Sequence, residues 1–265
     1  MSDWEYLTLE KDDRILIVSF DSLNQINTLN IQLMRELTSV AIDLQQDNEL
    51  SAVILRGNDT MFTGGMNLKD SEILSARDGT MADERILAKV GPSMCAAWEA
   101  LDLVTIVAIE GWCIGGGVAL AAACDWRVAG SDAKIYVPEL KLGMNMSWQS
   151  IPRLVNLIGP SKTKELLILA EPQGADLAKE WGLIDHITQP GEALNKAKDL
   201  ATQVAEMPPI PVRMTKRAVT VSATALNNAT SFMDVDQFVV TQHTSDSQEG
   251  MAAFFEKRKP KFEGR

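Results

Sequence analysis

Residues 109–120 read IEGWCIGGGVAL, and the three consecutive glycines at 115–117 stand between two apolar segments of different character. The run before them is rich in β-branched residues, and the run after them is rich in alanine. This pattern predicts a strand, a tight turn and the first turn of a helix. Glycines at such a turn let a ligand approach the backbone, and the first N–H groups of the helix point outward at the positive end of its dipole. The turn can therefore hold developing negative charge, although close packing of the helix on the strand explains the same glycines.

A second strand with a glycine turn lies about fifty residues upstream. Residues 52–57, AVILRG, predict another buried strand, which runs into residues 61–69, MFTGGMNLK. Two strand ends that both expose backbone donors can bind one oxygen atom between them. Stabilisation of an enolate or a tetrahedral oxyanion requires such an arrangement.

Together with residues 136–143, YVPELKLG, these two segments resemble the crotonase superfamily of enoyl-CoA hydratases and isomerases. The similarity extends over nearly the whole chain and includes residues 26–30 (INTLN), 34–37 (MREL), 124–129 (CDWRVA), 248–254 (QEGMAAF) and 257–260 (KRKP). The resemblance implies an α/β fold with a crotonase-like core of stacked ββα units and a helical C-terminal oligomerisation region. It also implies that the C-terminal helices pack against neighbouring subunits in a homotrimer or a dimer of trimers.

The periodicity of apolar residues locates further elements. Strands are expected at 15–20, 52–55 and 104–109. Apolar residues recur at helical spacing over 33–44 after an Asn30 cap, a further helix is expected between residue 83 and about Leu101, and another begins at Gly116. Residues 71–83 are expected to form a polar, mobile connection. Beyond Gly143 the pattern becomes helical and predicts helices at 151–158, 161–170, 176–181, 212–225, 232–242 and 249–256.

Prolines at 208, 209 and 211 mark a break near Met207. We therefore expect a core at residues 1–206, which binds the acyl-CoA, and a helical region at 207–265. Within that region Phe232, Val235, Phe238 and Val239 form an apolar stripe. The stripe is explained equally well by packing on the chain's own core or on another subunit.

The composition indicates an ordinary globular protein, with 265 residues, 46% hydrophobic and 23% charged. Its net charge of −11 argues against nucleic acid and anionic membrane as partners, because phosphate groups would be repelled over most of the surface. The basic cluster at 257–261 either lies at a solvated helix end or contacts the nucleotide phosphates of coenzyme A.

The cysteines and the first residues bear on location. Cys95, Cys113 and Cys124 are odd in number and lack C-x-x-C spacing, which favours a reducing compartment. The first residues, MSDWE, do not have the basic and apolar regions of a secretory leader. The expected location is the cytoplasm.

The resemblance assigns the oxyanion hole to the backbone N–H groups of Met66 and Gly116. It places the substrate, an acyl-CoA thioester, against Asn24, Ile26, Gly64, Gly65, Asn67, Leu68, Lys69, Gly115 and Ala119. Lys69 either reaches the phosphates of the coenzyme or is solvated. Coenzyme A is part of the substrate, so no separate cofactor is expected.

The carboxylates decide which reaction is possible. Members of the superfamily that hydrate a double bond usually carry two glutamates, and the positions that match them here hold Ala119 and Glu139. Alanine can neither activate water nor donate a proton, whereas a carboxylate in an apolar pocket can have its pKa raised toward neutrality. One acid and one oxyanion hole suffice to move a proton between two carbons. We therefore expect a Δ3,Δ2-enoyl-CoA isomerase in which Glu139 is the catalytic acid and base.

Several alternatives stay open. The single carboxylate, Met66 and the pair Trp112 and Cys113 also resemble the hydroxycinnamoyl-CoA hydratase-lyases. An enoyl-CoA hydratase, an acyl-CoA decarboxylase and a non-enzymatic acyl-CoA-binding relative are further possibilities. His186 and His243 lack a second ligand at metal spacing, so neither a metal site nor a histidine-based triad is expected. The bulky residues at 144–148, MNMSW, predict a reshaped acyl pocket.

Overall fold

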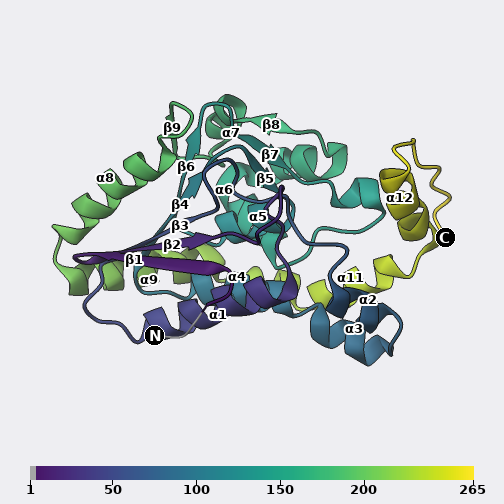
Figure 1. The fold of residues 1–265 in the computed structure, drawn as a ribbon, viewed down its shortest axis with the longest axis horizontal. Coiled ribbons are helices and arrows are strands. Elements are labelled where there is room, and N and C mark those ends of the chain that lie inside the picture. The colour runs from purple at the N-terminus through teal and green to yellow at the C-terminus, as the bar shows by residue number, and fades with distance from the viewer. Residues whose placement is uncertain (1–3) are drawn as a thin grey trace.

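The computed structural model describes residues 4–265 and shows an α/β fold built on a six-stranded sheet (Figure 1). The strand order is β1-β2-β3-β4-β6-β9, in which β1 and β2 pair antiparallel and all other neighbours pair parallel. These strands span Leu7–Asp12, Ile15–Phe20, Ala52–Arg56, Val104–Ile109, Trp126–Gly130 and His186–Thr188. A smaller sheet in the order β5-β7-β8 contains Trp112–Ile114, Lys134–Tyr136 and Gln173–Gly174. The predicted fold class is confirmed.

The central strands are apolar throughout because helices cover both faces of the large sheet. In β3, Val53 and Leu55 belong to the core that contains α1 and α4, whereas Ala52 and Ile54 pack against α8 on the other face. The helices of this part are α1 Ile31–Gln45, α2 Ser71–Arg77, α3 Met81–Leu87, α4 Val90–Glu99, α5 Gly116–Ala122, α6 Ser150–Lys164, α7 Ala175–Trp181 and α8 Ala193–Ala205. Two short turns, the 3-10 helix η1 Glu139–Leu142 and the π-helical η2 Glu165–Leu169, complete it.

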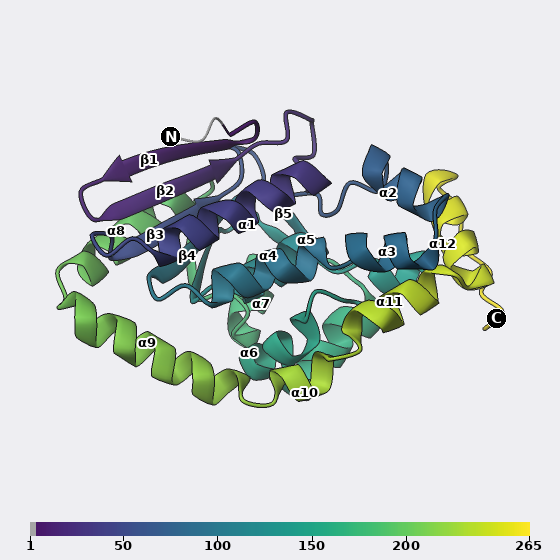
Figure 2. The same cartoon turned by 90° about the horizontal axis from the view of Figure 1, so that it is seen from below.

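The rest of the chain is helical, as predicted, and comprises α9 Pro209–Thr224, α10 Asn227–Ser231, α11 Asp234–Gln242 and α12 Ser245–Phe255. Figure 2 shows this series running along one side of the molecule from α8 to the C-terminus beside α2 and α3. The apolar stripe is divided, since Phe238 and Val239 are buried whereas Phe232 is 77% exposed. The boundary at residue 206 and the oligomeric state stay predictions. Within residues 4–265, no helix is both long and apolar enough to cross a membrane.

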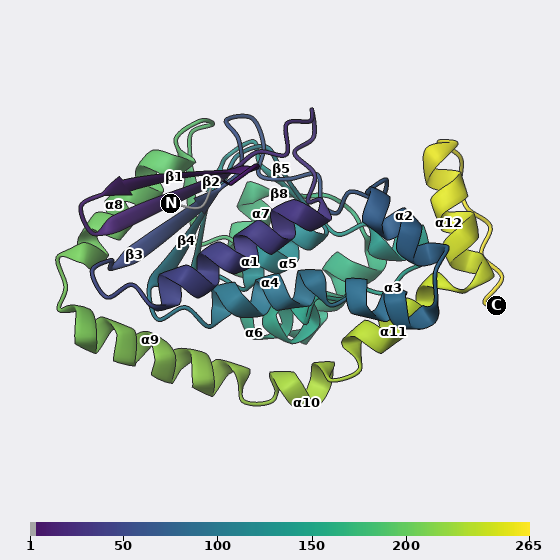
Figure 3. The ribbon, with the colours of Figure 1, turned by 60° about the horizontal axis from the view of Figure 1, so that its bottom comes forward.

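The prediction of a mobile connection at residues 71–83 is wrong, because most of this segment lies in α2 and α3. Polar residues within this segment and immediately before it act as helix caps. Asp70 accepts a hydrogen bond from the Glu72 N–H at 2.8 Å, and Thr80 and Asp83 form a reciprocal capping box. Figure 3 shows both helices beside α11 and α12, and a contact of 2.7 Å between Glu84 Oε2 and His243 Nε2 joins α3 to the end of α11.

A buried asparagine connects the end of β2 to the first glycine turn. The Asn27 amide nitrogen donates to the carbonyl oxygens of Phe20 at 3.2 Å and Phe62 at 2.8 Å, and its amide oxygen accepts from the Ser22 N–H at 2.9 Å. Asn27 has a φ of +43°, in the left-handed region that asparagine tolerates better than most residues. This one side chain therefore fixes where the glycine turn begins relative to the sheet.

Replacing Asn27 by alanine is expected to lower the free energy of unfolding by about 3 kcal/mol, because three buried backbone groups lose their partner. Urea denaturation followed by circular dichroism measures this loss. The control is Asn48→Ala, at an exposed position whose side chain makes no hydrogen bond within residues 4–265. Equal urea midpoints for the two variants would contradict the anchoring role of Asn27.

Candidate active site

Two glycine corners lie side by side beyond the carboxyl ends of β3 and β4. The segments at 62–64 and 110–114 run parallel and exchange backbone hydrogen bonds, with the Thr63 N–H donating to Trp112 O at 2.9 Å and the Ile114 N–H donating to Thr63 O at 3.0 Å. Gly65 has a φ of +84°, and a Cβ at this position would lie 2.9 Å from the carbonyl oxygen of Ile114. The two corners therefore touch at a position that requires glycine.

Each corner places an unpartnered backbone donor at the cavity. On the first, the Leu29 N–H donates to Gly65 O and the Asn67 N–H donates to Leu29 O, and these bonds leave the Met66 N–H free. On the second, Gly116 opens α5, where an N–H group has no acceptor within the helix. Across residues 4–265, neither the Met66 N–H nor the Gly116 N–H donates a hydrogen bond. Both residues line the same cavity.

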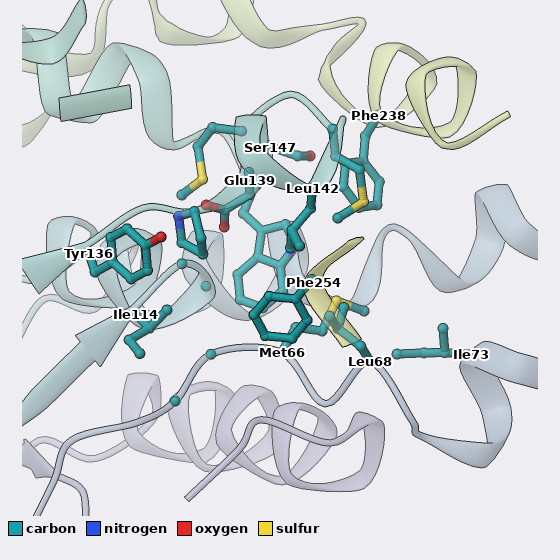
Figure 4. A pocket seen from close by; sticks show the side chains of 18 of the residues that line it. Met66, Leu68, Ile73, Ile114, Tyr136, Glu139, Leu142, Ser147, Phe238 and Phe254 are labelled. Carbon is teal, nitrogen blue, oxygen red and sulfur yellow. The ribbon is translucent and has the colours of Figure 1, made fainter. Parts of the chain in front are cut away.

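The cavity has a volume of about 380 Å³ and a largely apolar wall. In the part of the chain that the structure describes, Glu139 and Arg77 are the charged residues of this wall. Figure 4 shows the Glu139 carboxyl group directed into the space, with Met66, Leu142 and Phe254 around it. Eight of the predicted site residues line it: Ile26, Gly64, Gly65, Met66, Leu68, Gly115, Gly116 and Glu139.

Glu139 is fixed by the turn that follows β7. The Gly115 N–H donates to Tyr136 O at 2.8 Å and thereby joins the second glycine corner to the strand that leads into η1. Glu139 is the first residue of η1, and Gly143, at φ +71°, ends this turn. A Cβ on Gly115 would lie 2.6 Å from Glu139 Oε1, so the carboxyl group packs directly on a bare backbone.

The environment of Glu139 favours its protonated form. The residue is half-buried, but its Oε2 atom is enclosed and has no hydrogen-bond partner. Burial removes water from the carboxylate and raises the pKa of Glu139 to about 7, an effect that a backbone hydrogen bond partly opposes. At neutral pH both protonation states are therefore populated, which suits a group that accepts and returns a proton.

Four predicted substrate-binding residues lie outside the cavity wall, and their contact with substrate stays a prediction. Asn24 braces a turn, accepting from the Ile26 N–H at 3.2 Å, and Asn67 accepts from the Lys69 N–H at 3.1 Å. The Lys69 ammonium group lies 5.2 Å from the centre of the Phe255 ring. Ala119 is fully buried within α5.

Sequence reasoning missed the contribution of distant segments to the wall. Arg77 of α2, Gln242 of α11 and Phe254 of α12 line the cavity together with the glycine corners. The helical periodicity of the C-terminal region predicts its helices but does not say which of their residues meet the site. The bulky residues predicted to reshape the pocket are present in its wall, including Trp148.

A half-buried acid beside two free backbone donors is an arrangement that can move protons next to a carbonyl group and stabilise the resulting oxyanion. The family model described as enoyl-CoA hydratase/isomerase matches residues 10–265, and the chain belongs to this family. Its structural neighbours show that the fold is that of the crotonase superfamily.

Individual relatives match over nearly their full length. The chain is 32% identical to a probable enoyl-CoA hydratase of Mycobacterium tuberculosis and 31% identical to a crotonyl-CoA hydratase of Syntrophomonas wolfei, with 98% of each chain covered in both cases. The crystal structure of an enoyl-CoA hydratase/isomerase from Pseudoalteromonas atlantica superposes with a TM-score of 0.87 at 24% identity, over 98% of this chain and 100% of that one.

The raised pKa of Glu139 makes stability depend on pH. Between the ordinary glutamate value of 4.5 and about 7, the folded protein holds a proton that the unfolded chain has lost, so the stabilisation present at low pH disappears as the pH rises through this range. In Glu139→Gln this loss is absent. Across this pH interval the free energy of unfolding of the wild type is expected to fall by at most about 3 kcal/mol relative to that of the variant. Urea unfolding at several pH values measures this difference. A constant difference between the two proteins would contradict the assigned environment.

Proposed function

We propose that this enzyme is a Δ3,Δ2-enoyl-CoA isomerase that acts on acyl-CoA thioesters. The observation that carries the proposal is the set of acids at the site. Within residues 4–265, Glu139 is the sole carboxylate in the cavity wall, and the position that would supply a second acid in the superfamily holds the buried Ala119. The names of the relatives support a thioester of coenzyme A as the substrate.

The reaction follows from the positions of these groups. The Glu139 carboxylate takes a proton from C2 of a 3-enoyl thioester, and the electron pair of that bond delocalises onto C4 and the carbonyl oxygen. The Met66 and Gly116 N–H groups donate to this oxygen, and each such donor contributes about 3 to 4 kcal/mol of transition-state stabilisation. Glu139 then returns its proton to C4, which leaves the double bond between C2 and C3. This sequence needs no cofactor beyond the coenzyme A of the substrate.

The proposal extends to assembly through the C-terminal helices as a homotrimer or a dimer of trimers. Support comes from α9, which buries no residue and exposes Ile210, Met214, Val219 and Val221. Apolar surface of this kind is favourable to cover, and a second subunit of the same chain can cover it.

Hydration of a 2-enoyl thioester is the second candidate, and the observation that favours it is that the relatives above are named hydratases. In that reaction the oxygen of water bonds to C3 and one hydrogen is delivered to C2. Glu139 alone would have to orient the water and supply the proton. Formation of 3-hydroxyacyl-CoA as the main product from 2-enoyl-CoA would favour this candidate over the isomerase.

Replacement of Glu139 by glutamine is expected to lower kcat for the conversion of 3-hexenoyl-CoA to 2-hexenoyl-CoA by about 10³-fold, because the amide can neither take nor return the proton. Chromatography of the thioester products measures the rate. The matched control is Glu171→Gln, which removes an exposed carboxylate that pairs with Lys141 outside the cavity. Isomerisation at the wild-type rate in the Glu139 variant would refute the assigned role.

The pH profile should report the same carboxyl group. Since Glu139 must be ionised to take the C2 proton and its pKa is raised to about 7, kcat/KM is expected to increase tenfold per pH unit below that value and to level off above it. Initial rates between pH 5 and pH 9 test this expectation. A profile that levels off near the ordinary glutamate pKa would show that the carboxyl group is solvated during turnover.

A further inference from the structure

The Trp148 indole packs tightly beside Gly116, whose N–H is assigned to the oxyanion hole. A Cβ on Gly116 would lie 2.4 Å from Trp148 Cζ3, and a Cβ on Gly91 of α4 would lie 2.1 Å from Trp148 Cε2. The ring therefore contacts the bare Cα atoms of two helices, and it is 7% exposed. Gly115 and Gly116 are neighbours in the chain, so Glu139 meets one glycine of the corner and Trp148 meets the next.

The backbone that carries this ring adopts an unfavourable conformation. Trp148 and Gln149 have φ values of +62° and +55°, in the left-handed region that residues with a Cβ rarely occupy. Such residues persist where the surrounding structure determines their conformation, and they are frequent at functional sites.

Two buried charged groups supply that constraint. The Asp234 carboxylate of α11 accepts from Ser147 Oγ at 2.8 Å and from the Gln149 N–H at 3.0 Å. From the other side, the Arg153 guanidinium donates to Trp148 O at 2.9 Å, and it is held by both carboxylate oxygens of Glu99, at 2.7 and 2.9 Å. The indole is thereby fixed in position before any substrate binds.

The side chains on the face of α5 next to the ring offer no hydrogen-bonding group to a water molecule, and the Gly116 N–H on this face is the donor assigned to the thioester oxygen. Ala119 lies three residues after Gly116 on the same side of the helix, and its methyl group has no hydrogen-bonding capacity. Trp148 lines the cavity at this point and Ala119 does not. A water molecule about to attack C3 would need polar partners here.

We propose that Trp148 is the specificity-determining wall of the site: its indole contacts the C2–C4 segment of the bound acyl group, holds it flat and keeps water from C3. A conjugated dienolate requires these carbons to be coplanar, and a rigid aromatic face matches that shape. The inference rests on the proposed isomerase function and deepens it, since it explains why a proton taken by Glu139 returns to carbon.

The experiment compares Trp148→Phe and Trp148→Leu, which keep the position apolar, with the control Trp126→Leu at a partly exposed residue of β6 outside the cavity wall. Three rates are measured for each protein. They are hydrogen exchange at C2 of saturated hexanoyl-CoA in heavy water, isomerisation of 3-hexenoyl-CoA, and formation of 3-hydroxyhexanoyl-CoA from 2-hexenoyl-CoA. The exchange requires Glu139 and the oxyanion hole but no flat C2–C4 segment, and circular dichroism shows separately that each variant is folded.

For Trp148→Leu, exchange is expected to stay within about twofold of wild type, while kcat/KM for isomerisation falls about tenfold and the ratio of hydration to exchange rises about tenfold. Trp148→Phe should give intermediate values, and Trp126→Leu should match wild type in all three rates. Unchanged rates in both Trp148 variants would overturn the inference. Loss of exchange in proportion to isomerisation would also overturn it, because the ring would then only support the hole.

Failure of the proposed function has a different outcome. A wild-type enzyme that exchanges hexanoyl-CoA but does not isomerise 3-hexenoyl-CoA would refute the isomerase. In that case, a higher hydration-to-exchange ratio in Trp148→Leu would still support the exclusion of water by Trp148. An unchanged ratio would refute it. Absence of exchange in the wild type would refute both.

Discussion

The backbone pairing of the two glycine corners is the contact on which the active site depends. The hydrogen bonds of Thr63 with Trp112 and Ile114 set the separation of the Met66 and Gly116 N–H groups. Each bond contributes about 1 kcal/mol, so the pair alone would be weak. Its rigidity comes from the sheet behind it, where β3 and β4 pair in parallel register and both faces are covered by helices. The corners meet because parallel neighbouring strands end at the same edge.

The same packing imposes costs that a protein optimised for stability alone would avoid. Enclosing Glu139 Oε2 without a partner disfavours the ionised form, and the left-handed conformations at Trp148 and Gln149 are unfavourable for residues with side chains. Both features lie against consecutive glycines of one corner. The buried Asp234 and Arg153 offset the strain around Trp148, and they involve helices α11 and α6, so the C-terminal region supports the site from within its own chain.

Local sequence patterns predict the parts of the fold that depend on interactions between residues close together in the chain. The apolar runs of β2 and β4 and the Asn30 cap of α1 appear where the sequence indicates them, because burial and capping act within a few residues. Residues 71–83 were misread because capping side chains have the composition of a loop. In the site, the glycine corners and Glu139 lie in short sequence motifs that can be recognised without a structure. Tertiary packing places Phe238, Gln242 and Phe254 in the cavity wall, and the periodicity of their helices does not predict this.

The contrast between the relatives' names and the acids present here has a physical explanation. An identity of 31–32% over nearly the whole chain goes with a shared fold. In the proposed mechanism the two glycine corners stabilise an enolate, a step that isomerisation and hydration can both use. Which product forms depends on what meets C3 and C4 after that step. In the proposal, two side chains bear on this choice: Ala119, in the first turn of α5, and Trp148, whose ring packs against Gly116 at the start of that helix. The proposed isomerase differs from a hydratase in a few side chains next to the reacting carbons, and overall similarity between chains reports the shared fold rather than those side chains.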